Sequence, residues 1–339
     1  MTDQVRDNAD AVLWLTERDV IDLVSLNDAI EALSQGLLLD GKGEAANVDK
    51  ALGTWNGTSS MHALGSMMPR KGYIGFKTWA NTPKGATAIF SLFAAENGQL
   101  LAMMEAGALG QMRTAGISGL ATLALADPLA DDMALIGTGA QALMQVAAIA
   151  ATRRLKRLRV FSPSPDNRSA FVSRARAAFQ FDVIDCGSLD DAVRGASIVT
   201  LITRAKSPFI SAALIAAGAH LNAAGAILPG NAEFHQDVFE RASLIVVDSL
   251  PNARKASTEF IERFGTDGAG WEGVNTLGSV LANKISRPEG TDITLFKPMG
   301  MGLSDLSVAL IAYERARASG VGVPLARAQR ATPKWTALT

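Results

Sequence analysis

The feature that most constrains the fold of this chain is a short apolar run that leads into a glycine-rich turn at residues 134–142. Gly137 permits a tight turn, Gly139 lets backbone N–H groups approach a pyrophosphate, and Ala142 lets a helix pack closely on the strand. A helix that begins near Ala140 offers unpaired N–H groups and a partial positive charge to phosphates. The pattern predicts a nicotinamide or flavin dinucleotide site; the alternative is a glycine turn that binds nothing. The predicted cofactor-binding residues of this turn are Gly137, Thr138, Gly139, Ala140, Gln141 and Ala142.

The composition limits the kinds of protein that this chain can be. Its 339 residues are 48% hydrophobic and 19% charged, which is typical of a globular protein with an ample core. The net charge of -1 gives no polybasic face, so we expect neither nucleic acid nor a membrane as a partner. The polar segment Met1–Asp10 is a loose tail unlike a signal peptide, and apolar runs such as Leu143–Ala151 are too short to cross a bilayer. The expectation is a cytoplasmic enzyme.

Cysteine and histidine give no indication of a disulfide or a metal site. Cys186 is the only cysteine, so no internal disulfide can form, and a small buried residue in or just after a strand is expected there. His62, His220 and His235 lie far apart without the spacing of metal ligands. The sequence therefore predicts no metal.

The first third of the chain has an α+β pattern built on an antiparallel sheet. Thr16 and Asp19 form the pattern of a capping box, and a second amphipathic helix is expected over Leu26–Leu38, capped by Asn27. Strands are expected within Asn47–Met68, on either side of a hairpin turn at Trp55–Thr58, and a further strand at Tyr73–Trp79. A second hairpin is expected from Ile89–Phe93 and Leu100–Met104, with Glu96-Asn97-Gly98 between them. A helix is expected over Ala106–Ala126.

The pattern changes near Asp127-Pro128, where strands begin to alternate with helices. The expected strands are Met133–Ile136, Leu158–Phe161, Asp182–Ile184, Ile198–Ile202, His220–Ala224 and Leu244–Val247. Such alternation predicts an α/β fold with a doubly wound parallel sheet. An alanine-rich helix over Ser304–Ser319 is expected to rejoin the first domain. We therefore divide the chain into a domain of residues 1–124 and 304–339 and a dinucleotide-binding domain of residues 125–303.

Two cations in apolar surroundings are the predicted catalytic residues. Lys77 lies in an apolar strand, where burial lowers the pKa of an amine and suits it to proton transfer or to a hydrogen bond with a carbonyl or imine. The alternative is an edge-strand lysine that reaches water. Arg113 lies in an apolar helix, where a guanidinium needs a carboxylate from the substrate or from the protein, with Glu105 as the internal candidate. Thr114 is either a second donor to substrate or a residue that bonds its own helix.

Two loops are expected beside the nicotinamide and the substrate. Ligands of doubly wound sheets bind at the carboxyl ends of strands, which places the loop Gly225–Gly230 there, unless it is an ordinary turn. The second loop, Phe296–Gly302, precedes a helix that opens at Ser304 with Asp305 in its first turn; helix capping by Ser304 is its other interpretation. From these edges the predicted cofactor-binding residues are Thr203, Asn222, Ala224 and Lys297, and the predicted substrate-binding residues are Ile227 and Gly300.

The segment after the second parallel strand bears on the choice between NAD and NADP. An NAD enzyme usually carries an acid there, about 20 residues past the glycines, to bind the ribose. The sequence Phe161–Pro165 has no acid, and Asp166 fits the first turn of a helix instead. The segment favours NADP over NAD, with Ser162, Ser164 and Arg168 around the 2′-phosphate.

Taken in order along nearly the whole chain, these motifs resemble the ornithine cyclodeaminase/μ-crystallin family. The matching stretches are the Lys77 strand, Leu109–Ala115 (the family's threonine-x-x-arginine-threonine-alanine), Gly137–Ala142, Gly218–Asn222, and Gly300 with Asp305. The resemblance implies a Rossmann domain joined to an α+β substrate-binding and dimerisation domain, and a homodimer formed through the sheet of that domain. It also implies that Lys77 and Arg113 hold the carboxylate and the reacting group of an amino or imino acid beside the nicotinamide.

Two departures from the family pattern affect the predicted reaction. Cyclodeaminases carry an aspartate in the loop after the fifth strand, where this chain has Ala226, Ile227 and Leu228, and Ile227 can neither take nor give a proton. This favours the reductase branch of the family, which acts on the C=N bonds of imino acids or oxidises amino acids. The family also often carries an arginine near residues 47–50 for the substrate carboxylate, and Lys50 is its substitute here.

The sequence thus predicts an NAD(P)H-dependent reductase of α-imino acids or an amino-acid dehydrogenase, with a small imino or amino acid as its partner. A cyclodeaminase that recycles bound NAD+ and releases ammonia from ornithine or lysine is the second interpretation. A non-catalytic NADPH-dependent binding protein of the μ-crystallin type is the third. The pattern leaves open the role of His62 and whether Trp271 lines the pocket or caps a helix.

Overall fold

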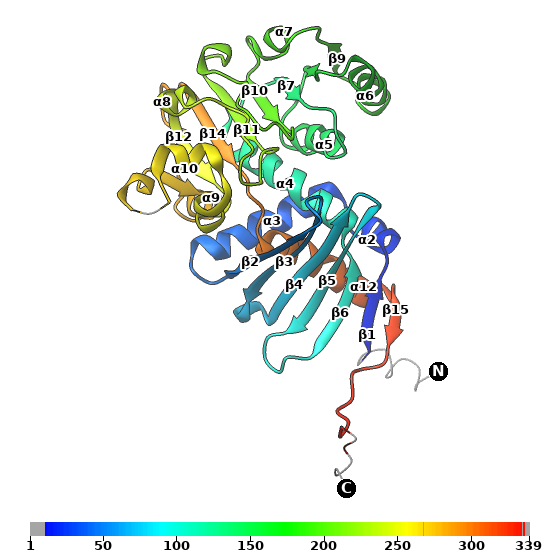
Figure 1. The fold of residues 1–339 in the computed structure, drawn as a ribbon. Coiled ribbons are helices and arrows are strands. Elements are labelled where there is room, and N and C mark those ends of the chain that lie inside the picture. Colours follow the sequence, from blue (N-terminus) through cyan, green and yellow to red (C-terminus); the bar gives the residue numbers. More distant parts are fainter. Residues whose placement is uncertain (1–10, 267, 334, 336–339) are drawn as a thin grey trace.

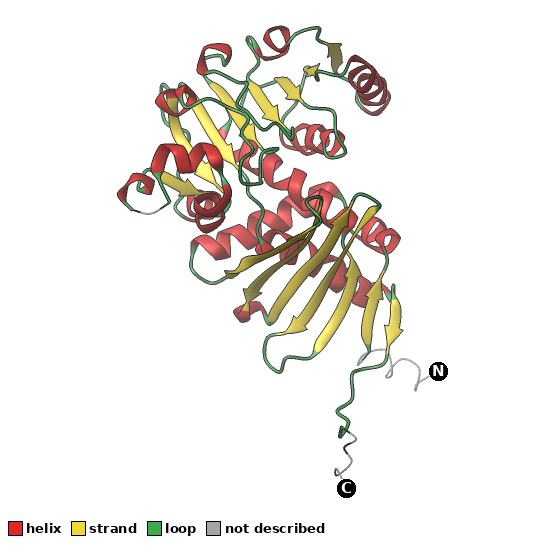
Figure 2. Cartoon of the chain, in the orientation of Figure 1, coloured by secondary structure: helices red, strands yellow, loops and turns green. Residues whose placement is uncertain are grey.

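The computed structural model describes residues 11–266, 268–333 and 335. Two separate sheets occupy opposite halves of the molecule, one of seven strands and one of eight (Figure 1). Figure 2 shows long helices beside the seven-stranded sheet and shorter helices around the eight-stranded one. The α/β prediction, with a parallel Rossmann-type sheet beside an α+β region, is confirmed.

The seven-stranded sheet has the order β15-β1-β6-β5-β4-β3-β2 and is antiparallel except between β1 and β6. Its strands are β1 (Val12–Leu15), β2 (Ala46–Trp55), β3 (Ser59–Met68), β4 (Tyr73–Thr82), β5 (Gly85–Ala94), β6 (Leu100–Glu105) and β15 (Val323–Leu325). The predicted turn at Trp55–Thr58 is confirmed: three residues join Trp55 to its partner Ser59, and Asn56 and Gly57 among them adopt φ values of 52° and 65°. The short strands β1 and β15 were not predicted.

Four helices accompany this sheet: α2 (Glu17–Leu23), α3 (Leu26–Gly41), α4 (Gly107–Leu125) and α12 (Gly302–Ser319). The capping box of Thr16 and Asp19 is confirmed, but the predicted cap at Asn27 is wrong, because Ser25 caps α3 together with Asp28. The predicted opening of α12 at Ser304 is also wrong. The helix begins two residues earlier, at Gly302. The side chain of Asn47 in β2 accepts a hydrogen bond from the Leu303 N–H at 2.8 Å and thereby takes the place of an N-cap side chain.

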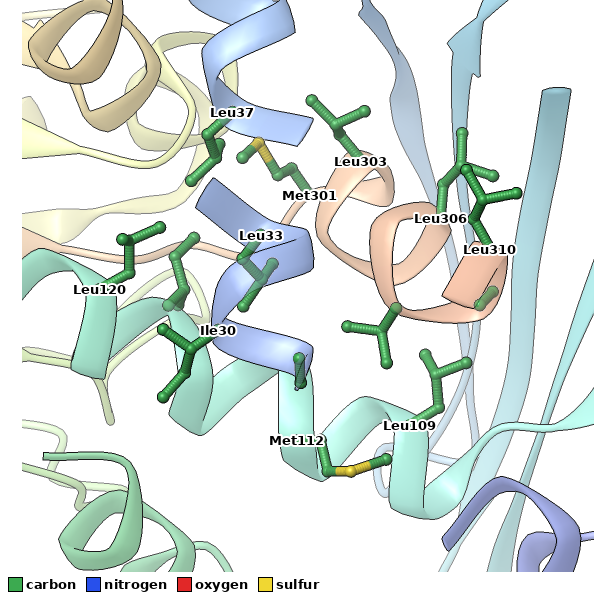
Figure 3. Close-up of a cluster of buried hydrophobic side chains, with 14 of the residues drawn as sticks. Ile30, Leu33, Leu37, Leu109, Met112, Leu120, Met301, Leu303, Leu306 and Leu310 are labelled. Carbon is green, nitrogen blue, oxygen red and sulfur yellow. The ribbon is translucent and has the colours of Figure 1, made fainter. Parts of the chain in front are cut away.

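The helices α3, α4 and α12 share one apolar core, in which α3 lies between the other two (Figure 3). Leu33 and Leu37 of α3 are almost fully buried, as are Leu109 of α4 and Leu306 of α12. Each such side chain contributes roughly 1.5–3 kcal/mol when fully buried. This core fixes α4 and α12 relative to one another, and both helices carry charged groups of the candidate site.

The eight-stranded sheet is parallel throughout, in the order β13-β12-β14-β11-β10-β7-β8-β9. Its strands are β7 (Asp132–Ile136), β8 (Arg157–Phe161), β9 (Asp182–Asp185), β10 (Ile198–Leu201), β11 (Ala219–Ala223), β12 (Ala242–Val247), β13 (Val274–Thr276) and β14 (Ile293–Lys297). The six predicted strands are present. β13 and β14 were not predicted, and the placement of Phe296 and Lys297 in a loop is wrong, because they end the buried strand β14 between β11 and β12.

The helices of this half are short, apart from two. They are α5 (Ala142–Thr152), α6 (Pro165–Ala178), α7 (Leu189–Val193), α8 (Asp237–Arg241), α9 (Leu250–Ala256), α10 (Thr258–Phe264) and α11 (Leu277–Ala282), with single 3₁₀ turns at Ala212–Leu214 and Ala269–Trp271. A further 3₁₀ turn, Pro69–Lys71, joins β3 and β4 of the seven-stranded sheet. The start of α5 predicted at Ala140 is wrong by two residues, because Gln141 is its N-cap. Within the described part of the chain, no helix combines the length and apolarity needed to cross a membrane.

Candidate active site

Three charged side chains from three different elements meet in the interior beside the seven-stranded sheet. Lys77 of β4 donates to Asp305 Oδ1 of α12 at 2.6 Å, and Arg113 Nε of α4 lies 3.2 Å from the same oxygen. Lys77 is 4% exposed and Asp305 is fully buried. Removing such groups from water is costly unless they are paired, so this cluster depends on both cations facing one carboxylate.

The cluster sets the pKa of Lys77 near neutrality. Burial, and then the positive charge of Arg113, lowers the pKa of Lys77 to about 8, although the negative charge of Asp305 raises it in part. The ammonium form therefore still predominates at pH 7, while losing its proton costs much less than in water. A group with such a pKa can both donate and take back a proton near physiological pH.

The partner predicted for Arg113 within the protein is wrong. Glu105 accepts a hydrogen bond from the Glu17 N–H at 2.7 Å, while Arg113 pairs with Asp305. Oδ2 of Asp305 is buried with no hydrogen-bond partner among the described residues. Thr114 donates to the carbonyl of Gly110 at 2.7 Å, so its hydroxyl bonds its own helix.

The carboxyl end of β14 lies directly against Arg113. A Cβ at Gly300, just beyond β14, would stand 3.2 Å from Arg113 Nη1, and Gly300 has a φ of 82°, which favours glycine. Its N–H donates to Asp248 at 2.7 Å, and its carbonyl accepts from Asn252 at 2.7 Å. The charged cluster thus adjoins the edge of the parallel sheet at which dinucleotides bind in such folds.

Lys50 and an aromatic pair extend this charged region. The ring of Trp79 lies 5.0 Å from Lys77 Nζ and stacks on His62 with centroids 4.3 Å apart. Burial, and then the charge of Arg113, lowers the pKa of Lys50, while burial followed by Lys50 and Lys77 lowers the pKa of His62. The structure therefore brings Lys50 near Arg113, and it adds His62 and Trp79, which alternation along β4 could have indicated because Trp79 lies two residues after Lys77.

The predicted glycine turn follows β7 and has the shape that a bound pyrophosphate needs. Gly137 has a φ of 107°, and a Cβ there would lie 2.7 Å from the Ile202 carbonyl, so a side chain is excluded. At Gly139, apart from its chain neighbours, no atom of the described residues lies within 4 Å of the Cβ position, so the turn is open. The N-cap Gln141 makes no side-chain cap, so the start of α5 is not covered by that side chain, although the Ala142 N–H donates to the Gly139 carbonyl at 3.1 Å. The residues from Gly137 to Ala142 therefore fit a dinucleotide phosphate.

Not every residue predicted to bind cofactor reaches this edge. Asn222 is fully buried, donates to Thr122 of α4 at 3.0 Å and lies 3.2 Å from His220. Lys297 is also fully buried and faces Glu259 at 3.4 Å. Both side chains are used inside the protein, so the structure does not bring them to the open turn.

The remaining loop residues have mixed placements. Thr203 follows β10, and its hydroxyl donates to the buried carboxylate of Glu233. Ala224 is buried just after β11. Ile227 is partly buried in the loop beyond. Trp271, whose role was open, is 2% exposed and donates to the Gly265 carbonyl at 2.9 Å, which is a structural role.

The segment expected at the 2′-position lies at the carboxyl end of β8. Arg168 donates to the Ser162 carbonyl at 3.0 Å and pairs with Asp185 at the end of β9. Ser164 caps α6 and accepts from the Asn167 N–H at 3.4 Å. The three predicted residues thus converge, with Asp185 as an acid that the sequence analysis did not consider. Across the described ranges, no group of three or more His, Cys, Asp or Glu side chains is placed to hold a metal ion.

Comparisons with known proteins show which family this chain resembles. The model of the ornithine cyclodeaminase/mu-crystallin family matches residues 14–320. The chain is 31% identical over 224 residues to the ketimine reductase mu-crystallin of Mus musculus, which covers 66% of this chain and 67% of that protein. It is 30% identical over 257 residues to the ornithine cyclodeaminase of Brucella suis biovar 1, which covers 73% of this chain and 70% of that protein.

A solved structure gives the same result for the fold. An archaeal alanine dehydrogenase dimer with bound NAD matches with a TM-score of 0.85 at 27% identity, over 93% of this chain and 99% of that one. The relatives thus include both a ketimine reductase and a cyclodeaminase, so the residues of this chain must distinguish the two reactions.

Proposed function

The chain belongs to the ornithine cyclodeaminase/mu-crystallin family, and we propose that it is an NAD(P)H-dependent reductase of α-imino acids, an oxidoreductase acting on C=N or CH–NH2 groups. The observation that carries the proposal is the buried Lys77, with a pKa of about 8, held by Asp305 beside Arg113 and the Gly300 edge. The similarity to a ketimine reductase and to an alanine dehydrogenase supports it.

Each charged group has a role that follows from its place. Arg113, with Lys50 nearby, binds the α-carboxylate of the substrate, since a guanidinium can form two parallel hydrogen bonds to it. Lys77 donates a proton to the imine nitrogen, and Asp305 keeps that ammonium charged before transfer. A bound NAD(P)H supplies the hydride to the imine carbon, so one hydride and one proton convert C=N to CH–NH.

For the cofactor, we propose NADP in preference to NAD. The support is the convergence of Ser162, Ser164 and Arg168 at the end of β8, where the 2′-phosphate of a dinucleotide would lie. The ion pair of Asp185 with Arg168 is the observation against this preference, because it engages the guanidinium that would bind the 2′-phosphate. Titration with NADPH and NADH separately gives the two dissociation constants, and equal or tighter NADH binding contradicts the preference.

Cyclodeamination is the second candidate, and Ile227 is the residue that disfavours it. The loop after β11 holds buried Ala226 and partly buried Ile227 at the place where the resemblance to cyclodeaminases implies an aspartate. Without a carboxylate there, the loop offers no group to activate an attacking amine.

We also propose a homodimer formed through the outer face of the seven-stranded sheet. In the register of β3 and β4, Met61, Met67 and Phe76 lie on the face opposite Lys77, and they are 60%, 36% and 40% exposed. An apolar face of this kind is typical of an interface. The similarity to an alanine dehydrogenase named as a dimer supports this proposal, and light scattering measures the mass in solution.

The experiment for the reaction uses a panel of cyclic and acyclic α-imino acids with NADPH and NADH in turn. Loss of reduced-nicotinamide absorbance with at least one imine is the expected result. Ammonia released from ornithine without added cofactor would favour the cyclodeaminase instead. Tight cofactor binding without turnover of any imine, ornithine or lysine would favour a ligand-binding protein.

A further inference from the structure

A second buried carboxylate, outside the charged cluster, lies behind the carboxyl edge of the parallel sheet. Glu233 follows β11 and is fully buried. Its Oε1 accepts from the N–H and the hydroxyl of Thr203 at 2.8 and 2.7 Å. Its Oε2 accepts from the N–H groups of Gly225 and Ala226 at 2.9 and 3.0 Å. Four hydrogen bonds therefore join one side chain to two loops.

The two loops are those that follow neighbouring strands at the cofactor edge. Thr203 comes after β10, and Gly225 comes after β11. The loops approach so closely that a Cβ at Gly225 would stand 2.1 Å from the Thr203 nitrogen. At this contact Glu233 accepts hydrogen bonds from the N–H groups of both Thr203 and Gly225. The Ile202 carbonyl beside Thr203 in turn packs over Gly137, because it lies 2.7 Å from the Cβ position there.

The position of Glu233 is itself fixed from behind. Its N–H donates to Glu259 Oε1 at 3.0 Å, and the same oxygen lies 3.4 Å from Lys297 Nζ at the end of β14. Ser257 donates to the other oxygen of Glu259 at 3.1 Å. The network explains why Lys297 points into the protein, because its ammonium group forms an ion pair with the buried carboxylate of Glu259.

We infer that Glu233 is a positioning residue for the nicotinamide cofactor. This inference rests on the proposed function, because it presumes that the edge of β7, β10 and β11 binds a dinucleotide. Both oxygens of Glu233 are engaged by the protein, so it acts through Thr203, Gly225 and Ala226 and not by touching the cofactor. The arrangement holds the two loops in the binding geometry before the cofactor arrives, and such preorganisation raises affinity.

The test is the dissociation constant for NADH and NADPH, measured by fluorescence titration without any imino acid. In Glu233→Gln an amide NH2 group replaces one carboxylate oxygen. If it faces Gly225 and Ala226, two hydrogen bonds are lost, and if it faces Thr203, the bond from the Thr203 N–H is lost while the hydroxyl can turn to accept. We expect affinity to fall by about tenfold or more, on the basis that each 1.4 kcal/mol is a factor of ten. The matched control is Glu240→Gln on exposed α8, which should bind as the unaltered protein does.

A second pair of variants keeps the inference testable where Glu233→Gln does not fold. Thr203→Val removes one of the four hydrogen bonds to Glu233, together with the bond that the hydroxyl accepts from the Ala205 N–H at 3.2 Å, and Thr203→Ser restores the hydroxyl. Weaker cofactor binding in the first and recovery in the second support the inference. Unaltered binding in folded Glu233→Gln, or in Thr203→Val where Glu233→Gln does not fold, overturns it. If the unaltered protein binds neither cofactor, the proposed function itself fails, which is a distinct result.

Discussion

The two halves of the molecule each bury a carboxylate, and they stabilise it in opposite ways. Asp305, beside the antiparallel sheet, faces the cationic side chains of Lys77 and Arg113. Glu233, behind the parallel sheet, is held by backbone N–H groups and one hydroxyl. Under the proposed function, the half with the antiparallel sheet binds substrate and depends on side-chain charge and pH. The half with the parallel sheet binds the cofactor and depends on the path of the backbone.

The substitution expected to have the largest effect on activity is Lys77→Met, in the half that depends on side-chain charge. Loss of the proton donor should lower kcat for imine reduction by about 10²–10⁴-fold, the usual contribution of general acid catalysis. The dissociation constant for NADPH should stay unchanged, because Lys77 lies in the other half. A variant that retains near-normal kcat would remove Lys77 from the mechanism.

Arg113→Lys tests whether shape as well as charge matters in the substrate half. A lysine keeps the positive charge beside Asp305 but cannot form two parallel bonds to a carboxylate. We expect KM for the imino acid to rise about 10–100-fold with little change in cofactor affinity, since charged hydrogen bonds are worth about 1.5–3 kcal/mol. The control is Arg154→Lys, an exposed residue that lines a cavity at the opposite, amino edge of the parallel sheet. An unchanged KM would contradict the assigned role.

Two alanine substitutions separate binding from folding in the cofactor half. Gly139→Ala places a methyl in the open turn, so Tm should be unchanged while NADPH affinity falls about tenfold or more, one factor of ten per 1.4 kcal/mol. Gly137→Ala forces a φ of 107° on alanine against the Ile202 carbonyl, so Tm itself should fall. Thermal unfolding and titration check both, and a Gly139→Ala protein that binds normally would place the cofactor elsewhere.

The smallest expected effect is on the pH dependence of the unaltered protein. For imine reduction, kcat/KM should decline as pH rises through about 8, where Lys77 loses the proton it donates. For stability the sign is opposite: between about pH 8 and the ordinary value of 10.5, the unfolded chain binds more protons than the native one. This group therefore raises the free energy of unfolding as pH increases across that window. A rate profile that is flat through pH 8 would contradict the assignment.

What the sequence predicted well was local in origin. The capping box at Thr16, the turn at Trp55–Thr58 and the alternation of strands and helices each depend on neighbouring residues. The cap at Asn27 was wrong for a related reason, since Ser25 offers an equivalent oxygen two residues earlier. β14 was missed because its five residues run into a glycine loop and carry no alternation.

What could not be predicted depends on contacts between distant segments. Lys77 and Asp305 are 228 positions apart, and no local pattern marks Asp305 as the partner of Lys77 and Arg113. Glu233 likewise reaches Thr203 across 30 positions. Asn222 was expected at the cofactor edge because of its place near a strand end, and Lys297 because it was placed in a glycine loop, but their side chains turn inward to Thr122 and Glu259.

The most direct test of the account is transfer of deuterium from the cofactor. The protein is given an α-imino acid that it turns over, with NADPH or NADH deuterated at either face of nicotinamide C4, and the amino acid product is analysed by mass spectrometry. The account predicts that one of the two labelled faces gives product carrying deuterium at Cα, and that Lys77→Met forms this product much more slowly. Product without deuterium from either face, or ammonia release without a reduced product, would contradict hydride transfer to the C=N carbon.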